Sequence, residues 1–314
     1  MIEVTHLTKS YGGTRAVDDL SFTIRPGAVT GFLGPNGAGK STTMRMILGL
    51  DRPTGGTALI DGKTYAQLKN PLRQVGALLE AKWVHPNRSA RGHLRWMAAS
   101  NGISTSRVTD VLGLVGLSEV AGKRAGTFSL GMSQRLGIAG ALLGDPPVLL
   151  FDEPVNGLDP EGIVWIRRFM QSLAAEGRTV LVSSHLLSEM ALTATHLVVI
   201  GRGRLISDCS TAEFVDNASS SAVRVRSPQL AALRAAMTSR DLTVQEDGPD
   251  ALLVVGSSTE QVGELAAAKG VVLHELSAQR GSLEEAFMQL TGGDVQYASS
   301  PPPAESGPAR KVAS

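Results

Sequence analysis

Two kinds of hydrophobic pattern alternate along the first two hundred residues. Short β-type runs alternate with longer helical segments. The runs that we predict to be strands are Val29–Leu33, Val75–Leu79, Val148–Phe151, Thr179–Ser183 and Leu197–Ile200. Helices are predicted to begin at Gly39, Ser89, Ser129, Pro160 and Leu186. This order predicts an α/β domain with a largely parallel sheet.

A second pattern alternates short β-type segments with glycine turns near the N-terminus. The segments MIEVTHL, LSFTI and TALIDG, at residues 1–7, 20–24 and 57–62, read as strands of an antiparallel β portion. We expect turns at Gly12–Gly13 and Gly55–Gly56.

The polar stretch DNASSS, at residues 216–221, predicts a domain boundary. We expect a first domain over 1–216, a linker over 217–221 and a small α/β domain over 222–292. The predicted elements of that domain follow the order βαββαβ, at residues 222–227, 229–237, 242–246, 251–256, 259–268 and 271–276. A last helix, Ser282–Leu290, precedes a Pro/Ser/Ala-rich tail, 293–314, that we expect to be disordered.

Composition restricts the possible functions. The chain has 30 basic and 29 acidic residues and a net charge of +1, so we expect no nucleic-acid partner. A single cysteine, Cys209, excludes an internal disulfide and indicates a reducing compartment. The apolar run Leu136–Leu143 is well short of a membrane span, and the N-terminus lacks the apolar core of a signal peptide. We therefore expect a soluble chain, with no transmembrane segment of its own, that acts at a membrane only through a partner.

The strongest chemical motif follows the first apolar strand. Residues Gly34, Pro35, Asn36, Gly37, Ala38, Gly39, Lys40, Ser41 and Thr42 form a GxxxxGKS/T loop that opens a helix, the context in which such loops bind phosphate. Backbone N–H groups and the helix N-terminus would surround the phosphates of ATP. Lys40 would neutralise the β- and γ-phosphates, and the Ser41 hydroxyl would bind Mg²⁺. The alternative is a glycine-rich turn with no ligand.

A pair of acids ends another apolar strand. Asp152 can hold Mg²⁺ through water, and Glu153 can orient and deprotonate the attacking water. Acids often end strands, so this motif alone is a weak signal, and it becomes a strong one together with the phosphate-binding loop.

The order of the motifs resembles a known family. FSLGMSQR lies between the loop and the acids, and NGLD and SSHLLSE follow the acids. Residues 1–216 resemble the ATP-binding cassette (ABC) family, most closely the ATPase subunits of bacitracin- and lantibiotic-type exporters. The C-terminal GSLEEAFMQLTG resembles an appendage of some of those subunits.

The resemblance implies a P-loop NTPase cassette with a parallel-sheet core, an antiparallel β subdomain and a helical subdomain. Two chains, identical or paralogous, would sandwich two ATP molecules head to tail. Ser129 and Gly131 would then contact the ATP of the opposite chain. This copy departs from the usual LSGGQ form at Phe128, Leu130 and Met132, as the exporter type also does.

The resemblance implies roles for four other residues. Tyr11 would stack on adenine, His185 would contact the γ-phosphate, and Asp159 would communicate between the two sites. Glu80 stands where the family usually has a glutamine that touches Mg²⁺ and water, on a loop that senses the permease. Each has a simpler alternative: a strand tyrosine, a packing histidine, a helix N-cap and a solvated strand-end carboxylate. The remaining histidines, His6, His85, His93, His196 and His274, show no metal-ligand spacing.

Three functions fit the motifs to different degrees. The first is a motor subunit that uses ATP and Mg²⁺ to power membrane permease subunits at the cytoplasmic face of the membrane, exporting a drug, peptide antibiotic or lipid-like compound. The second is a soluble ABC ATPase acting on translation or DNA, which the single cassette and balanced charge disfavour. The third, an unrelated P-loop kinase or switch, conflicts with FSLGMSQR placed before the acidic strand.

Overall fold

The computed structural model describes residues 1–80, 84–218, 222–238 and 242–279. Its centre is a six-stranded sheet in the order β5-β6-β7-β3-β8-β9. The strands of this sheet are β3 (Val29–Leu33), β5 (Val75–Leu78), β6 (Val148–Asp152), β7 (Thr179–Ser184), β8 (His196–Gly201) and β9 (Arg204–Ser210). All neighbouring pairs are parallel except β8 and β9. The predicted, largely parallel sheet is confirmed, although β9 was not predicted.

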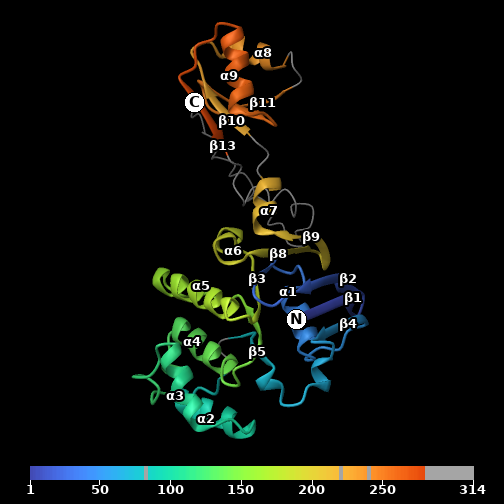
Figure 1. Cartoon of the computed structure of the whole chain (residues 1–314), viewed down its shortest axis with the longest axis vertical. Helices are drawn as coiled ribbons and strands as arrows, with labels where there is room; N and C mark the ends of the chain where they lie inside the picture. Colours follow the sequence, from blue (N-terminus) through green and yellow to red (C-terminus); the bar gives the residue numbers. More distant parts are fainter. Residues whose placement is uncertain (81–83, 219–221, 239–241, 280–314) are drawn as a thin grey trace, which may run out of the picture.

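Mostly apolar runs form the inner strands β3, β6, β7 and β8 because both faces of the sheet are covered there. Side chains alternate between two cores: Leu149 and Phe151 pack with the helical layer, whereas Leu150 packs on the opposite face. The helices on the first face are α2 (Ala90–Ser100), α3 (Thr105–Leu114), α4 (Leu130–Ala141), α5 (Pro160–Ala175), α6 (Leu187–Thr193) and α7 (Thr211–Ala218). Helix α1 (Lys40–Ile47) packs on the other face (Figure 1). The five predicted helix starts agree with α1, α2, α4, α5 and α6 to within a residue, but α3 and α7 were not predicted.

The antiparallel β portion is confirmed and shares a core with α1. It is a three-stranded sheet in the order β2-β1-β4, formed by β1 (Ile2–Tyr11), β2 (Thr14–Ile24) and β4 (Gly55–Ile60). The expected turn at Gly55–Gly56 is wrong, because both glycines lie in β4. Gly56 has φ +74° where the register with β1 shifts, and an added Cβ would lie 2.1 Å from the His6 carbonyl oxygen. Glycine is needed here for close backbone approach within a strand.

The C-terminal part folds as the predicted βαββαβ unit with its own apolar core. Its elements are β10 (Ala222–Arg226), α8 (Leu230–Thr238), β11 (Thr243–Glu246), β12 (Ala251–Val255), α9 (Thr259–Ala268) and β13 (Glu275–Gln279). The sheet order is β11-β12-β10-β13, with antiparallel neighbours. The last strand begins four residues later than the start we predicted at Val271, because Val271 packs into the core before the strand begins. The predicted helix Ser282–Leu290 and the tail 293–314 lie outside the described residues.

Short 3₁₀ helices complete the fold at Tyr65–Gln67, Pro71–Arg73 and Ala125–Thr127. Within the described ranges, no helix is long and apolar enough to span a bilayer.

Candidate functional site: a phosphate loop and two acids at one edge of the sheet

The phosphate-binding loop connects β3 to α1, as the motif predicts. Gly37 and Gly39 have φ of +84° and +101°, in the region that favours glycine. A Cβ at Gly39 would lie 2.6 Å from the carbonyl oxygen of Ala16, so the neighbouring β2 strand also requires glycine. The crest of the loop, Asn36–Gly37, is exposed, and so is Ser41 in the first turn of α1. The loop thus presents backbone and a helix N-terminus to solvent, a geometry suited to phosphate.

Lys40 is buried beneath this loop, with 7% of its surface exposed. Its ammonium donates hydrogen bonds to the carbonyl oxygens of Gly34, at 2.6 Å, and Pro35, at 3.3 Å. Burial lowers the pKa of Lys40, whereas the nearby Glu153 and Asp152 carboxylates oppose this shift. A buried cation kept near carboxylates is a ready counter-charge for an anionic ligand.

Glu153 connects the loop to the end of β7. Its Oε1 lies 3.7 Å from Lys40 Nζ, and its Oε2 lies 2.9 Å from Nδ1 of His185. The parallel sheet explains this meeting, since the C-terminal ends of β3, β6 and β7 lie at the same edge. Lys40 thus meets Glu153 and His185, which follow it by more than a hundred positions, and all three were predicted for the site from the sequence.

Ser183 is a member of this cluster that sequence reasoning missed. Its Oγ donates a hydrogen bond to the Asp152 carboxylate and accepts one from the Glu153 N–H at 2.9 Å. The signal available in the sequence was the SSH tripeptide, 183–185, but only the strand register shows that Ser183 faces Asp152.

The oxygen donors at this edge fit Mg²⁺. Ser41 offers a hydroxyl and Asp152 a carboxylate, and Mg²⁺ prefers one or two such ligands while it retains water and phosphate oxygens. Among the described residues, no group of three or more His, Cys, Asp or Glu side chains that could hold a metal occurs. Glu80 follows β5, the strand beside β6, and is exposed.

Tyr11 ends β1 and is 49% exposed. Its hydroxyl donates a hydrogen bond to Asp51 at 3.1 Å, and Lys9 Nζ lies 4.9 Å from the ring centroid. Asp51 is in turn bound by Arg45 of α1, so the aromatic ring is tied to the helix that begins at the phosphate loop. This position is compatible with stacking on a base.

Ser129 and Gly131 belong to the helical layer. Ser129 caps α4, with its Oγ accepting a hydrogen bond from the Met132 N–H at 3.2 Å, and Gly131 packs on the loop at Gly157–Leu158. Asp159 caps α5 by accepting from the Gly162 N–H at 2.9 Å. Across the described residues, no hydrogen bond joins Ser129 to the phosphate loop of the same chain.

Helix α4 also contacts the loop that contains Glu153 and Asn156, through Gln134. Its amide nitrogen lies 3.4 Å from the Glu153 carbonyl oxygen and 3.3 Å from that of Asn156. The segment around Ser129 is thus held against the acidic loop of its own chain.

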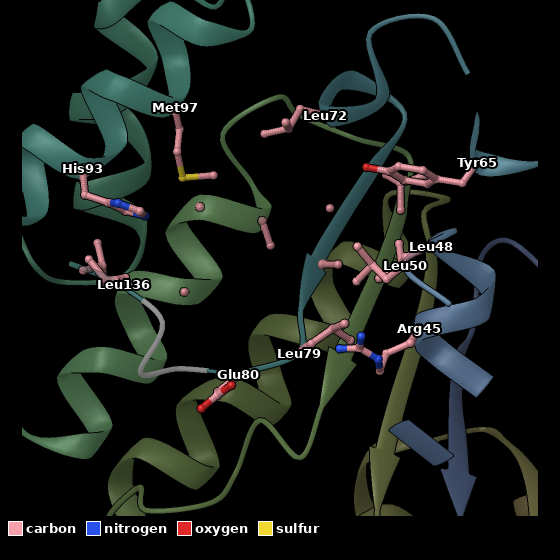
Figure 2. Close-up of a pocket in the computed structure, with 17 residues that line it drawn as sticks. Arg45, Leu48, Leu50, Tyr65, Leu72, Leu79, Glu80, His93, Met97 and Leu136 are labelled. Atoms are coloured by element: carbon pink, nitrogen blue, oxygen red, sulfur yellow. The ribbon is translucent and has the colours of Figure 1, made fainter. Parts of the chain in front are cut away.

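A groove of about 440 Å³ opens between α1, β5, α2 and α4. Figure 2 shows Leu79 and Glu80 of the β5 segment between Met97 of α2 on one side and Arg45 of α1 on the other. The walls are mostly apolar, and Arg45, Glu80 and His93 supply polar groups. Burial lowers the pKa of His93, and the positive charge of Arg88 acts in the same direction.

The chain is similar in sequence to proteins of a known family. A family model described as ABC transporter matches residues 17–156, and a domain of unknown function matches residues 221–284. The chain is 38% identical over 299 residues to the bacitracin transport ATP-binding protein BcrA of Bacillus licheniformis, covering 93% of this chain and 98% of that protein. It is 37% identical over 206 residues to the lantibiotic transport ATP-binding protein SrtF of Streptococcus pyogenes, covering 66% and 89%.

Solved structures of ABC transporter components have a similar fold. An ATP-binding subunit of an ABC transporter superposes with a TM-score of 0.63 at 29% identity, covering 69% of this chain and 92% of that one. A dimeric bacterial ABC transporter cassette superposes with a TM-score of 0.62 at 25% identity, covering 67% and 99%. The fold, the loop with its two acids and near full-length similarity to such subunits agree, and the chain belongs to the ATP-binding subunits of ABC transporters.

Proposed function

We propose that this chain binds ATP with Mg²⁺, hydrolyses it and powers a separate permease that exports a peptide antibiotic or a related compound. The observation that supports this most strongly is the contact chain from Lys40 through Glu153 to His185, at the edge of the sheet where the phosphate loop ends. The names of the bacitracin and lantibiotic relatives support the substrate class.

Each residue of the site would have a separate role. The backbone of 34–42 would bind the phosphates, with Lys40 neutralising the β- and γ-phosphates and Tyr11 stacking on adenine. Glu153 would accept the proton of the attacking water, and His185 would contact the γ-phosphate. Ser41 and Asp152 would hold Mg²⁺, which when bound supplies positive charge against the phosphate oxygens.

A second cassette, a copy of this chain or a paralogue, would complete each site. Ser129 is exposed at a helix N-terminus, and within the described part of the chain its hydroxyl bonds to the Met132 N–H of its own helix turn, so the hydroxyl and the helix dipole are available to an anion on another chain. Asp159, which caps the helix after the loop that Gly131 contacts, would couple the two sites. The dimeric cassette among the structural neighbours supports this arrangement.

The permease would engage the groove beside β5. An apolar groove with a few charged side chains suits an amphipathic partner segment, and Glu80 lines this groove just after β5, the strand beside the Asp152-bearing β6. The chain would therefore lie at the cytoplasmic face of the membrane, held there by its permease.

The chain would divide into a cassette, 1–216, a linker, 217–221, and an accessory domain, 222–292. The separate apolar core of the βαββαβ unit and the two separate family matches support this division. We propose a regulatory or dimer-supporting role for the accessory domain.

Glu80 gives a first testable consequence. Glu80→Gln should leave ATP turnover within about tenfold, a barrier change of under ~1.4 kcal/mol, because an oxygen ligand is retained. Glu80→Ala should lower Mg²⁺-dependent turnover more and weaken stimulation by the permease. Steady-state ATPase assays with and without permease measure both effects. Wild-type behaviour of Glu80→Ala in both assays would reduce Glu80 to a strand-end carboxylate.

The proposed function as a whole is tested by affinity purification of the full chain from detergent-solubilised membranes. We expect a polytopic membrane protein to co-purify and to stimulate ATP turnover, and cells lacking the chain to become more sensitive to a peptide antibiotic. Co-sedimentation with ribosomes, without any membrane protein, would instead favour the soluble ABC ATPase.

A further inference from the structure

Ser183 lies between the two acidic residues and is fully buried at the C-terminal end of β7. Its hydroxyl donates to the Asp152 carboxylate and accepts from the Glu153 N–H at 2.9 Å. A single hydroxyl group therefore donates one hydrogen bond and accepts another, and its two partners are successive residues. The parallel register, which pairs Asp152 with Ser183, brings these groups together.

The bond to the Glu153 N–H holds an uncommon backbone conformation. Glu153 has φ +47°, in the left-handed region, which non-glycine residues adopt when the surroundings impose it. In this conformation its carboxylate reaches Lys40 and His185. Gln134 contacts the carbonyl oxygen of Glu153, but only Ser183 holds its N–H among the described hydrogen bonds.

We infer that Ser183 is a positioning residue for ATP hydrolysis. Its hydroxyl would hold the Asp152 carboxylate in place for Mg²⁺ and fix the backbone turn at Glu153, the proposed general base. This inference rests on the proposed function, because Ser183 would act through Asp152 and Glu153 and not through a contact of its own with ATP or Mg²⁺.

A threonine–valine pair isolates the hydroxyl from the shape of the side chain. Ser183→Thr keeps the hydroxyl, and Ser183→Val has the same shape without it, so both add equal bulk to the buried site. We expect Ser183→Val and Ser183→Ala to lower kcat about 10- to 100-fold, as loss of a supporting hydrogen bond does at metal sites. Ser183→Thr should restore most of the loss, and equilibrium binding of ATP in the absence of metal should stay unchanged because the phosphate loop is intact.

A second measurement does not depend on turnover. Mn²⁺ binding to the full chain with a non-hydrolysable ATP analogue, followed by electron paramagnetic resonance, reports on the Asp152 carboxylate. We expect Ser183→Val to bind Mn²⁺ about tenfold more weakly than Ser183→Thr.

Ser184 provides a matched control. It is equally buried on the same strand, but its hydroxyl accepts from the Leu186 N–H at 2.9 Å and contacts neither acid. Ser184→Ala should leave kcat and Mn²⁺ affinity unchanged, while thermal melting monitors folding of every variant.

Two results would overturn the inference: equal kcat and Mn²⁺ affinity for Ser183→Val and Ser183→Thr, or equal losses for Ser183→Ala and Ser184→Ala. Failure of the proposed function looks different. If the wild-type chain showed no ATP turnover with its permease, the proposed function would be refuted. A lower Mn²⁺ affinity of Ser183→Val than of Ser183→Thr would still show that the Ser183 hydroxyl positions the Asp152 carboxylate.

Discussion

Replacing Glu153 with glutamine should lower ATP turnover by about 10²- to 10⁴-fold, the usual contribution of a general base, while ATP binding is retained. Glutamine preserves the size of the side chain but cannot accept the proton of the attacking water. The phosphate loop and Lys40 remain in place, so ATP affinity should change little. Steady-state ATPase assays and equilibrium binding of a fluorescent ATP analogue measure the two quantities.

The same variant should accumulate as a closed dimer with two ATP molecules, because closure no longer ends in hydrolysis. Gel filtration with and without ATP detects this dimer. Glu161→Gln is a suitable control, since Glu161 is an exposed acid in the first turn of α5. An ATP-saturated Glu153→Gln chain that stayed monomeric with every cassette partner and with permease present would contradict the two-chain site.

Ser129→Arg should lower ATP turnover by about 10²-fold, as loss of one donor to a reacting anion does, without weakening ATP binding to the monomer. The substitution removes the hydroxyl that we assign to the opposite chain's γ-phosphate and places a long side chain between the two chains. Monomer binding should persist because Ser129 makes no hydrogen bond to the phosphate loop of its own chain in the described structure. Binding at low protein concentration and turnover at high concentration separate the two effects.

Ser104→Arg controls for the loss of a helix cap. Ser104 caps α3 by accepting from the Ser106 N–H, is equally exposed, and lies in the same helical layer. Each substitution should cost about 1 kcal/mol of stability through the lost cap. Only Ser129→Arg should block closure. Equal loss of monomer affinity for ATP in Ser129→Arg would mean that the residue acts within its own chain.

Much of the fold could be predicted because local pattern and global packing agree. β3 begins and ends at the predicted residues, since Val29–Leu33 is apolar except for Thr30 and is followed at once by the glycine loop. The N-caps Ser89 and Ser129 marked helix starts for the same local reason. α3 was missed although Ser104 caps it and its buried residues Val108, Val111 and Leu112 follow helical spacing.

Residues whose role depends on register could not be predicted. The two serines of SSH, Ser183 and Ser184, cannot be told apart from the sequence alone. Only the pairing of β6 with β7 places Ser183 opposite Asp152, whereas the Ser184 hydroxyl accepts a hydrogen bond from the Leu186 N–H. The glycines at 55–56 look like a turn, since local sequence does not reveal that the His6 carbonyl lies against Gly56. The contact between Lys40 and Glu153 likewise follows from the order of strands in the sheet.

The ion pair between Lys40 and Glu153 has a consequence for the end of the catalytic cycle. When a phosphate leaves a buried lysine, the lysine would otherwise be left as an uncompensated charge, which is unfavourable in a low-dielectric site. Glu153 can replace the departing anion as counter-ion, 3.7 Å from the ammonium, together with the carbonyl oxygens of Gly34 and Pro35. In the proposed cycle Glu153 would thus stand in for the departing phosphate, so that Lys40 is not left without a counter-charge.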